Sequence, residues 1–286
     1  MNLFIDLDST LIFKDENYST TISNEKVYID LLEREDGKLG VICKKTLSIL
    51  KSFCDSQNKL IIFSNRDKDD FDNINLSAHG INNYLEVLSF GYDIYKNNFI
   101  QVTWLNFIND RRLINSNKIN DFHNFIIEEL PGYLISEKNY GYLIKKEDLI
   151  GDYDFITYDY LKYYLEKFDI VKVFEDDSNI YLVLNLFNNS ELFDYIKFTY
   201  LLDEISCVVC SSESFFIDLM LKFKSNGIIN FKIENNIDFE EYLLINNLNC
   251  LLDSLISENI YIMNGNEFNT GEEVMYKVFE IFIDSL

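Results

Sequence analysis

The 286-residue sequence predicts an α/β protein in which a parallel-sheet core is interrupted by an inserted α+β domain. Two buried-strand patterns, at residues 3–7 and 59–63, each run directly into polar residues. A helical pattern lies between them, which is typical of a parallel sheet covered on both faces. From about residue 99 to 210 the pattern changes to strand-like runs between helical runs, which indicates an antiparallel α+β unit.

Each expected element follows from its local pattern. After the strand at 3–7, apolar periodicity predicts a helix at 44–54, and an uninterrupted apolar run predicts a buried strand at 59–63. A polar helical segment is expected at 72–79, followed by a strand, a turn at Gly91 and a second short strand. The later elements are strands at 172–174, 180–186, 205–210 and 260–263, and helices at 159–167, 191–202, 239–255 and from 272 onward.

Composition and charge restrict the class of partner. The chain is 48% hydrophobic and 15% aromatic, which is enough for a substantial core. Its net charge of −23 repels nucleic-acid backbones and anionic membranes, so neither long nucleic acid nor a membrane is expected as a partner. Acidic residues by position 6 argue against a signal sequence, and the odd count of five cysteines favours reduced thiols. We therefore expect a cytoplasmic protein, as a monomer or a homodimer.

The most specific motif is the Asp-Leu-Asp-Ser-Thr segment that follows the first predicted strand. Asp6 and Asp8 are two residues apart, and alternate residues of a strand share a face, so both carboxylates can converge on one pocket. Ligands of parallel sheets bind at this carboxyl end of the strands. One aspartate can attack phosphorus while the other transfers a proton, and a hard cation can neutralise the developing charge.

These residues resemble the first motif of the haloacid dehalogenase (HAD) superfamily, Asp-x-Asp-x-Thr. The resemblance implies a Rossmannoid parallel sheet, Asp6 as the nucleophile and Asp8 as the general acid and base. It also implies Mg²⁺ bound by the Asp6 side chain and the Asp8 carbonyl, and Thr10 among the phosphate-binding residues. The second family motif, a Ser or Thr after the next core strand, is matched by Ser64.

The neighbours of Ser64 and the later motifs extend the resemblance. Asn65 and Arg66 follow Ser64 and resemble the form seen in sugar-phosphatase branches. The family lysine of the third motif is not matched directly, and Lys224 is one of several nearby lysines that can substitute for it. The loop after the strand at 260–263 resembles the fourth motif, but its candidate metal ligands are Asn266, Glu267 and Asn269 instead of aspartates.

The spacing of the motifs predicts where the inserted domain lies. The spacing from Asp8 to Ser64 is only 56 residues, which leaves no room for a sizeable domain between them. In this superfamily such spacing implies a cap, which is a domain inserted after the second motif, as in Cof-like, sucrose-phosphatase and trehalose-phosphatase groups. We expect the core at 1–94 and 212–286 and the cap at 95–211.

A second segment competes for the fourth motif. Glu175, Asp176 and Asp177 follow a strand-like run, as in cap-poor members of the superfamily. If the strand at 172–174 lies in the same sheet as the strand at 3–7, this acidic segment is the fourth motif and the domain boundaries above are wrong.

Three functions therefore remain open. The first is a Mg²⁺-dependent phosphatase that hydrolyses a small phosphorylated metabolite, such as a sugar phosphate, through an aspartyl-phosphate at Asp6. The second is a catalytically weak or inactive relative that binds a phosphorylated ligand or a protein partner, which the altered third and fourth motifs favour. The third is a cap-poor nucleotide phosphatase.

Overall fold

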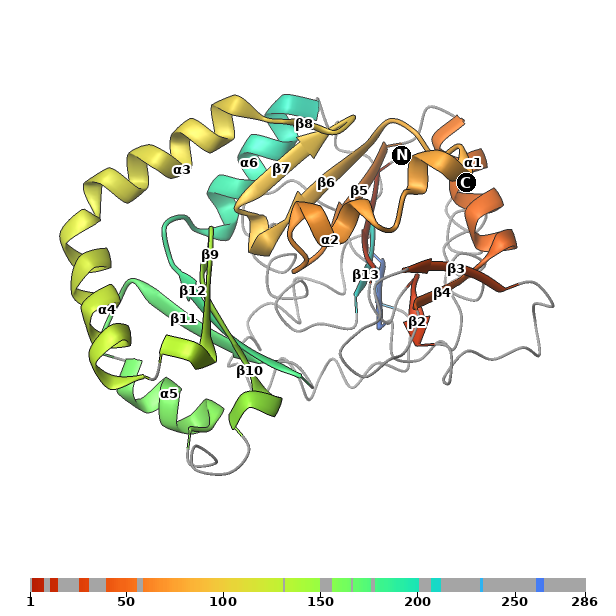
Figure 1. The fold of residues 1–286 in the computed structure, drawn as a ribbon. Coiled ribbons are helices and arrows are strands. Elements are labelled where there is room, and N and C mark those ends of the chain that lie inside the picture. Colours follow the sequence, from red (N-terminus) through yellow and green to blue (C-terminus); the bar gives the residue numbers. More distant parts are fainter. Residues whose placement is uncertain are drawn as a thin grey trace. The chain divides into compact units, whose positions relative to one another are not determined.

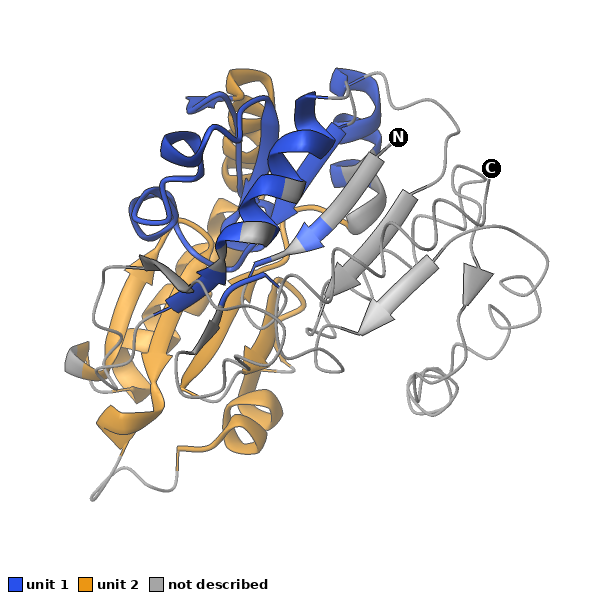
Figure 2. Cartoon of the chain, turned by 90° about the vertical axis from the view of Figure 1, so that its right-hand side faces the viewer, with its two compact units in different colours: residues 1–100, 189–286 blue, residues 101–188 orange. Residues whose placement is uncertain are grey.

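The computed structural model divides the chain into two compact units. Unit 1 combines Met1–Ile100 with Asn189–Leu286, and unit 2 is Gln101–Asn188 (Figure 2). The structure describes residues 2–7, 11–14, 26–30, 40–55, 59–130, 132–149, 156–165, 167–175, 178–200, 207–211, 232–233 and 261–264. Among these described residues no helix is long and apolar enough to cross a membrane.

Unit 1 is built on an eight-stranded sheet with the order β14-β15-β13-β1-β5-β6-β7-β8 (Figure 1). The pairings from β14 to β6 are parallel, and β7 and β8 extend the sheet as antiparallel strands. The strands are β1 Asn2–Asp6, β5 Lys59–Phe63, β6 Tyr84–Leu88, β7 Asp93–Lys96, β8 Phe99–Ile100, β13 Cys207–Ser211, β14 Lys232–Ile233 and β15 Tyr261–Asn264. The predicted parallel core sheet is therefore confirmed.

Uninterrupted apolar runs explain the central strands of this sheet. All but the first residue of β5 and of β6 are buried, as expected for parallel strands covered on both faces. Helix α1 (Lys44–Asp55) buries Leu47, Leu50 and Phe53 in the same core cluster as Leu60 and Ile62 of β5. The remaining helices of unit 1 are α2 Lys68–Asp72, the 3-10 helices Leu76–His79 and Ser89–Gly91, and α6 Asn189–Tyr200.

One predicted helix differs from the structure. The segment expected to be helical at 72–79 contains only the last residue of α2 and the separate 3-10 helix Leu76–His79. The interruption lies at Asn75, which adopts a left-handed backbone with φ of 47°. Its side chain accepts a hydrogen bond from the Ala78 N–H, so Asn75 caps a new turn and does not continue a helix.

A separate three-stranded sheet, β2-β4-β3, belongs to the N-terminal part of unit 1. Its strands are β2 Phe13–Lys14, β3 Lys26–Asp30 and β4 Gly40–Cys43, all paired antiparallel. The sequence patterns did not predict this sheet. Strand β4 leads directly into α1, so the sheet lies between the first motif and the first core helix along the chain.

Unit 2 contains a four-stranded antiparallel sheet with the order β11-β12-β10-β9. Helices α3, α4 and α5 lie along one side of this sheet (Figure 1). The elements are α3 Val102–Ile114, α4 Ser116–Glu129, β9 Ile135–Lys138, β10 Gly141–Lys145, α5 Tyr158–Leu165, β11 Val171–Glu175 and β12 Asn179–Leu184, with 3-10 helices Gly132–Leu134 and Lys146–Leu149. The expected α+β texture is thus present in this part of the chain.

The boundaries of the inserted unit differ from the expected 95–211. Strand β13, which was expected in the inserted domain, pairs in parallel with β1 and β15 in the core sheet. Helix α6 also belongs to unit 1, and so do β7 and β8. The second compact unit is thus 101–188, because β7, β8 and β13 pair in the core sheet and α6 is grouped with unit 1. The predicted helices at 239–255 and from 272 lie outside the described residues.

Candidate active site at the carboxyl edge of the core sheet

The carboxyl ends of β1 and β5 bring the first and second motifs together. The two strands are parallel neighbours, and Asp6 at the end of β1 is level with Phe63 at the end of β5. Ser64 follows Phe63 directly, so it lies next to the end of β1 at the same edge of the sheet. The parallel pairing therefore puts the ends of both motif strands at one edge of the sheet, where ligands of parallel sheets bind.

The backbone turns immediately after the first motif strand. The Leu7 carbonyl accepts hydrogen bonds from the N–H groups of both Leu11 and Ile12, each at 2.9 Å. All three side chains are buried in the core, which anchors both ends of this turn. Asp8 and Thr10 lie outside the described residues, and so does the side chain of Asp6, whose backbone ends β1.

The second motif forms a tight, buried turn. Ser64 is only 1% exposed, and its hydroxyl oxygen accepts a hydrogen bond from the Arg66 N–H at 3.2 Å. A serine hydroxyl carries one donor hydrogen in addition to its acceptor lone pairs. This hydrogen bond therefore orients the Ser64 oxygen and leaves its hydrogen able to donate to a ligand oxygen.

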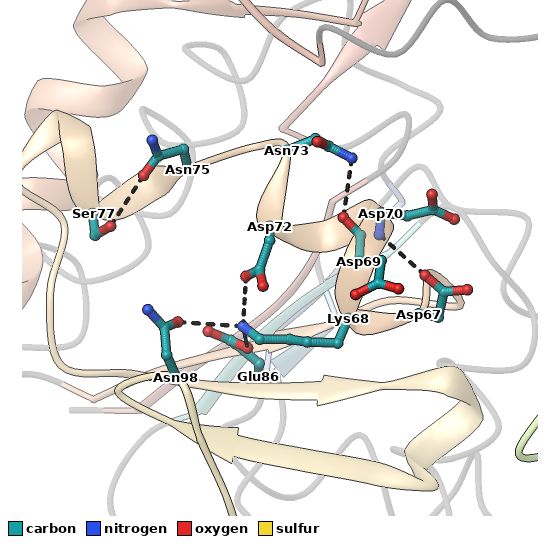
Figure 3. A network of polar contacts seen from close by, with 10 residues as sticks. All are labelled: Asp67, Lys68, Asp69, Asp70, Asp72, Asn73, Asn75, Ser77, Glu86 and Asn98. Atoms are coloured by element: carbon teal, nitrogen blue, oxygen red, sulfur yellow. Dashed lines mark hydrogen bonds and ion pairs between the residues drawn. The ribbon is translucent and has the colours of Figure 1, made fainter.

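The turn is attached to the end of β6 by two backbone hydrogen bonds. The Ser64 N–H donates to the Val87 carbonyl at 3.0 Å, and the Ser89 N–H donates to the Arg66 carbonyl at 3.1 Å. Helix α2 then begins, and the Asp67 side chain caps it by accepting a hydrogen bond from the Asp70 N–H (Figure 3). The segment from Ser64 to Asp67 is thus held at both ends by partners within unit 1.

A buried charged pair lies just beyond this turn, and the sequence patterns did not predict it. Lys68 Nζ contacts Glu86 Oε2 at 2.6 Å, and the Glu86 side chain is 1% exposed (Figure 3). Burial raises the pKa of the Glu86 carboxyl, while Lys68 acts in the opposite direction. The sequence signal that could have revealed this pair is Glu86 itself, a single carboxylate within the otherwise apolar strand β6.

The candidate fourth-motif loop follows a strand of the core sheet. Strand β15 ends at Asn264, and it is separated from β1 only by β13, to which both are paired in parallel. Ile5, Cys210 and Met263 are level across these three strands. Strand β15 therefore ends at the same edge of the sheet as β1. Asn266, Glu267 and Asn269 themselves lie outside the described residues, as does Lys224.

The competing acidic segment lies in a different sheet. Glu175 ends β11, which pairs with β12 in the antiparallel sheet of unit 2 and not with β1. The interpretation that made Glu175, Asp176 and Asp177 the fourth motif required β11 in the core sheet, so that interpretation is wrong. The hypothesis of a cap-poor nucleotide phosphatase depended on this interpretation and therefore loses its support.

One described cysteine could in principle have competed as a nucleophile. Cys54 is a free, half-buried thiol on α1. Burial, and secondarily the nearby charge of Asp55, raises its pKa to about 11, so little of it is thiolate at neutral pH. Cys54 is therefore a poor candidate for the nucleophile.

The fold of this chain is similar to that of several solved phosphatase structures. Sucrose-phosphatase from Synechocystis, in complex with sucrose and phosphate, has a TM-score of 0.54 at 10% sequence identity, covering 99% of this chain and 98% of that chain. The HAD subclass IIB sugar phosphatase BT4131 has a TM-score of 0.52 at 11% identity, covering 98% and 99%.

A third solved structure is also similar to this chain. Trehalose-6-phosphate phosphatase from Aspergillus fumigatus has a TM-score of 0.50 at 12% identity, covering 98% of this chain and 91% of that chain. No family model and no curated protein sequence matches this chain. At these identities the likeness establishes the fold, and the HAD-like architecture expected from the first motif is confirmed.

Proposed function

We propose that this protein is a magnesium-dependent phosphomonoester hydrolase that acts on a small phosphorylated metabolite, with a sugar phosphate as the expected substrate class. The observation that carries the proposal is the alignment of Asp6 with Phe63, which brings Ser64 beside the end of β1. The HAD-type fold and the sugar phosphatases that share it support the same class of chemistry.

In the proposed reaction the Asp6 carboxylate attacks phosphorus, and the bond from phosphorus to the ester oxygen breaks. Asp8 gives its proton to the leaving oxygen and then takes a proton from the water that hydrolyses the aspartyl-phosphate, releasing phosphate and free Asp6. The Ser64 hydroxyl donates a hydrogen bond to a phosphoryl oxygen. Thr10 and Arg66 are proposed as further phosphate contacts, together with Asn65 and Lys224.

Magnesium fits the donors that this edge of the sheet offers. Strands β1 and β15 end at the same edge, so Asp6 and the loop that carries Asn266, Glu267 and Asn269 can supply oxygen ligands together with the Asp8 carbonyl. When bound, the ion would neutralise charge on the transferring phosphoryl group. Two of these side chains are neutral amides, so we expect weaker metal binding than an all-carboxylate set would provide.

We propose unit 2 as the cap that selects the substrate. Tyr142 of β10 packs edge-on against Phe122 of α4, which identifies the face of the sheet that the helices cover. By register, Lys172, Phe174 and Tyr181 lie on the opposite face. This face of unit 2 carries the exposed Lys172 and the half-buried Phe174, side-chain types that can bind the hydroxyl groups of a sugar and pack on its ring.

The first experiment measures turnover of para-nitrophenyl phosphate and of a panel of sugar phosphates, with and without magnesium. Asp6→Asn should abolish turnover, since a carboxamide cannot replace the nucleophile. Asp8→Asn should lower kcat by roughly 10² to 10⁴, and Ser64→Ala should cost less. Asp55→Asn, at an exposed position at the end of α1, is the matched control and should leave kcat unchanged.

A second experiment separates a weak enzyme from a binding protein. The amide-rich loop after β15 favours a low wild-type rate, so Asn266→Asp should raise kcat and also raise the melting temperature gained in millimolar magnesium. If wild type and Asn266→Asp hydrolyse nothing on the panel, the catalytic proposal fails. Phosphate-dependent thermal stabilisation in that case would favour a protein that binds a phosphorylated ligand.

A further inference from the structure

Lys68, which lies beside the second motif, has an oxygen partner for each of its three N–H donors. Lys68 Nζ contacts Glu86 Oε2 at 2.6 Å, Asp72 Oδ1 at 2.8 Å and Asn98 Oδ1 at 3.2 Å (Figure 3). An ammonium group has three N–H donors, and these three oxygens match them. Lys68 lies only four residues after Ser64, but its charge is directed into the protein. It is therefore placed to hold structure and not to bind a phosphate.

The position of Glu86 is unusual for a carboxylate. It lies in the middle of β6, level with Ile62 of β5 and Tyr95 of β7, on a face that packs into the apolar core. An apolar pair of similar volume is often at least as stabilising as a buried ion pair. The charged pair instead fixes the positions of its two side chains relative to each other, because a hydrogen-bonded contact restricts geometry more narrowly than apolar packing does.

Three successive connections link the second-motif segment to the region of β6. Two are the backbone hydrogen bonds from Ser64 to Val87 and from Ser89 to Arg66, and the third is the Lys68–Glu86 pair. Ser89 adopts φ of 53°, a conformation that costs energy for a residue other than glycine. The N–H of this strained residue donates the hydrogen bond to the Arg66 carbonyl. The strain indicates that the surrounding structure holds Ser89 in the conformation that this hydrogen bond needs.

We propose that Lys68 and Glu86 are positioning residues that hold the Ser64–Arg66 turn at the carboxyl edge of the core sheet. They fasten the start of α2 to β6, so the turn immediately before α2 keeps one conformation. The Ser64 hydroxyl is then presented in a fixed direction. This inference rests on the proposed phosphatase function, in which that hydroxyl meets the transferring phosphoryl group.

The kinetic test is a double-mutant cycle. Lys68→Met should lower kcat for para-nitrophenyl phosphate by roughly 10- to 100-fold, because displacement of a catalytic group by about 1 Å has an effect of this size. The Michaelis constant should change less than threefold. In a Ser64→Ala background the same substitution should change kcat less than threefold, because the hydroxyl that it positions has been removed. A purely structural role would instead give equal losses in both backgrounds.

The matched control is Lys118→Met in unit 2. Lys118 and Asp169 also lie 2.6 Å apart, but both side chains are mostly exposed. This variant should keep wild-type kcat. If Lys68→Met does not fold, Lys68→Met with Glu86→Leu removes both charges together and restores an apolar core. That double variant should fold and still show the lower kcat. Wild-type kcat in it would overturn the proposal.

A second measurement does not depend on turnover. Amide hydrogen exchange at Ser64 and Ser89 reports the two backbone attachments directly, and Lys68→Met should accelerate it at least 10-fold under native conditions. The Leu184 amide, which donates to the Tyr140 carbonyl in unit 2, is the internal control and should not change. Unchanged exchange at Ser64 and Ser89 would refute the positioning role. Inactive wild type with accelerated exchange would refute only the proposed function.

Discussion

Two lysine–carboxylate pairs of equal length lie in contrasting parts of this molecule. Lys68–Glu86 in unit 1 and Lys118–Asp169 in unit 2 both have a closest contact of 2.6 Å. The side chains of the first pair are 16% and 1% exposed, and those of the second are 54% and 75% exposed. The comparison shows that contact distance alone does not measure what an ion pair contributes, because desolvation and solvent screening differ between the two sites.

The locations of the two pairs explain why they differ. Lys118 lies on α4 and Asp169 just before β11, both at exposed positions of unit 2, whereas Glu86 lies inside β6. Strands β5 and β6 of unit 1 are buried almost throughout, so any charge in them needs a partner inside the protein. Strands β9 and β11 of unit 2 keep polar residues at exposed positions, where water can solvate a charge. A charge inside a strand that is buried on both faces therefore needs a partner, whereas water can solvate the charges of the exposed pair in unit 2.

The largest effect on stability should come from breaking the buried pair. Lys68→Met leaves the Glu86 carboxylate uncompensated in the core and should lower the free energy of unfolding by about 3–5 kcal/mol. Urea denaturation followed by circular dichroism measures this change. A loss below about 1 kcal/mol would show that water or another group solvates Glu86, and that the contrast between the two units is smaller than their burial indicates.

A backbone substitution tests the stability of unit 2 without involving charge. Gly141 in β10 has φ of 141°, and an added Cβ would lie 2.1 Å from the Leu182 carbonyl oxygen. Gly141→Ala should therefore destabilise unit 2 by more than about 1 kcal/mol. Gly132→Ala is the matched control, because nothing lies within 4 Å of its added Cβ. Similar denaturation midpoints for the two variants would contradict the prediction.

The pH dependence of stability tests the buried carboxylate. Burial raises the pKa of the Glu86 carboxyl, Lys68 lowers it, and the charge of Asp72 raises it. Burial also raises the pKa values of Tyr84 and Tyr95, and the negative charge of Glu86 adds to these two shifts. A carboxyl whose folded pKa lies above its unfolded value favours the folded state at low pH, and this advantage is lost as pH rises through the folded value.

The unfolding free energy of wild type relative to Glu86→Gln should therefore fall as pH increases from 4 to 7. The expected fall is about 1.4 kcal/mol for each unit by which the pKa is raised. Denaturant titrations of both proteins at several pH values give this difference. A difference that instead grows with pH would mean that Lys68 lowers the Glu86 pKa more than burial raises it.

The smallest effect should come from the exposed pair. Lys118→Met should change the free energy of unfolding by less than about 1 kcal/mol, because solvent screens the contact. Whatever difference remains at low ionic strength should shrink further in 1 M salt, where the screening length is about 3 Å. A salt-insensitive loss of several kcal/mol would place this pair in the same class as Lys68–Glu86.

Local patterns predicted the elements that position the candidate site. The uninterrupted apolar run at 59–63 coincides with β5, and the Asp-x-Asp-x-Thr motif follows a strand, as expected. Leu11 and Ile12 after that motif are buried. These predictions succeeded because burial on both faces requires a continuous apolar strand, and the polar residues that end it must then gather at the sheet edge.

The same patterns could not assign partners to every strand. Strand β13 was recognised as a strand near 205–210, but it was expected in the inserted domain and lies beside β1 in the core sheet. An apolar strand looks alike in either sheet, because its local sequence records burial and not the identity of its neighbours. The small sheet β2-β4-β3 was missed, since its short strands carry little periodicity.

The sequence by itself therefore determined the α/β core, the first motif with Asp6 and Asp8, and Ser64 at the end of the next core strand. Only the tertiary structure decided the limits of the inserted unit, excluded the acidic segment at Glu175 from the core sheet, and paired Glu86 with Lys68 across 18 residues of chain. The physical reason is that strand patterns and motifs arise from neighbours in sequence, whereas sheet membership and the pairing of a buried charge depend on neighbours in space.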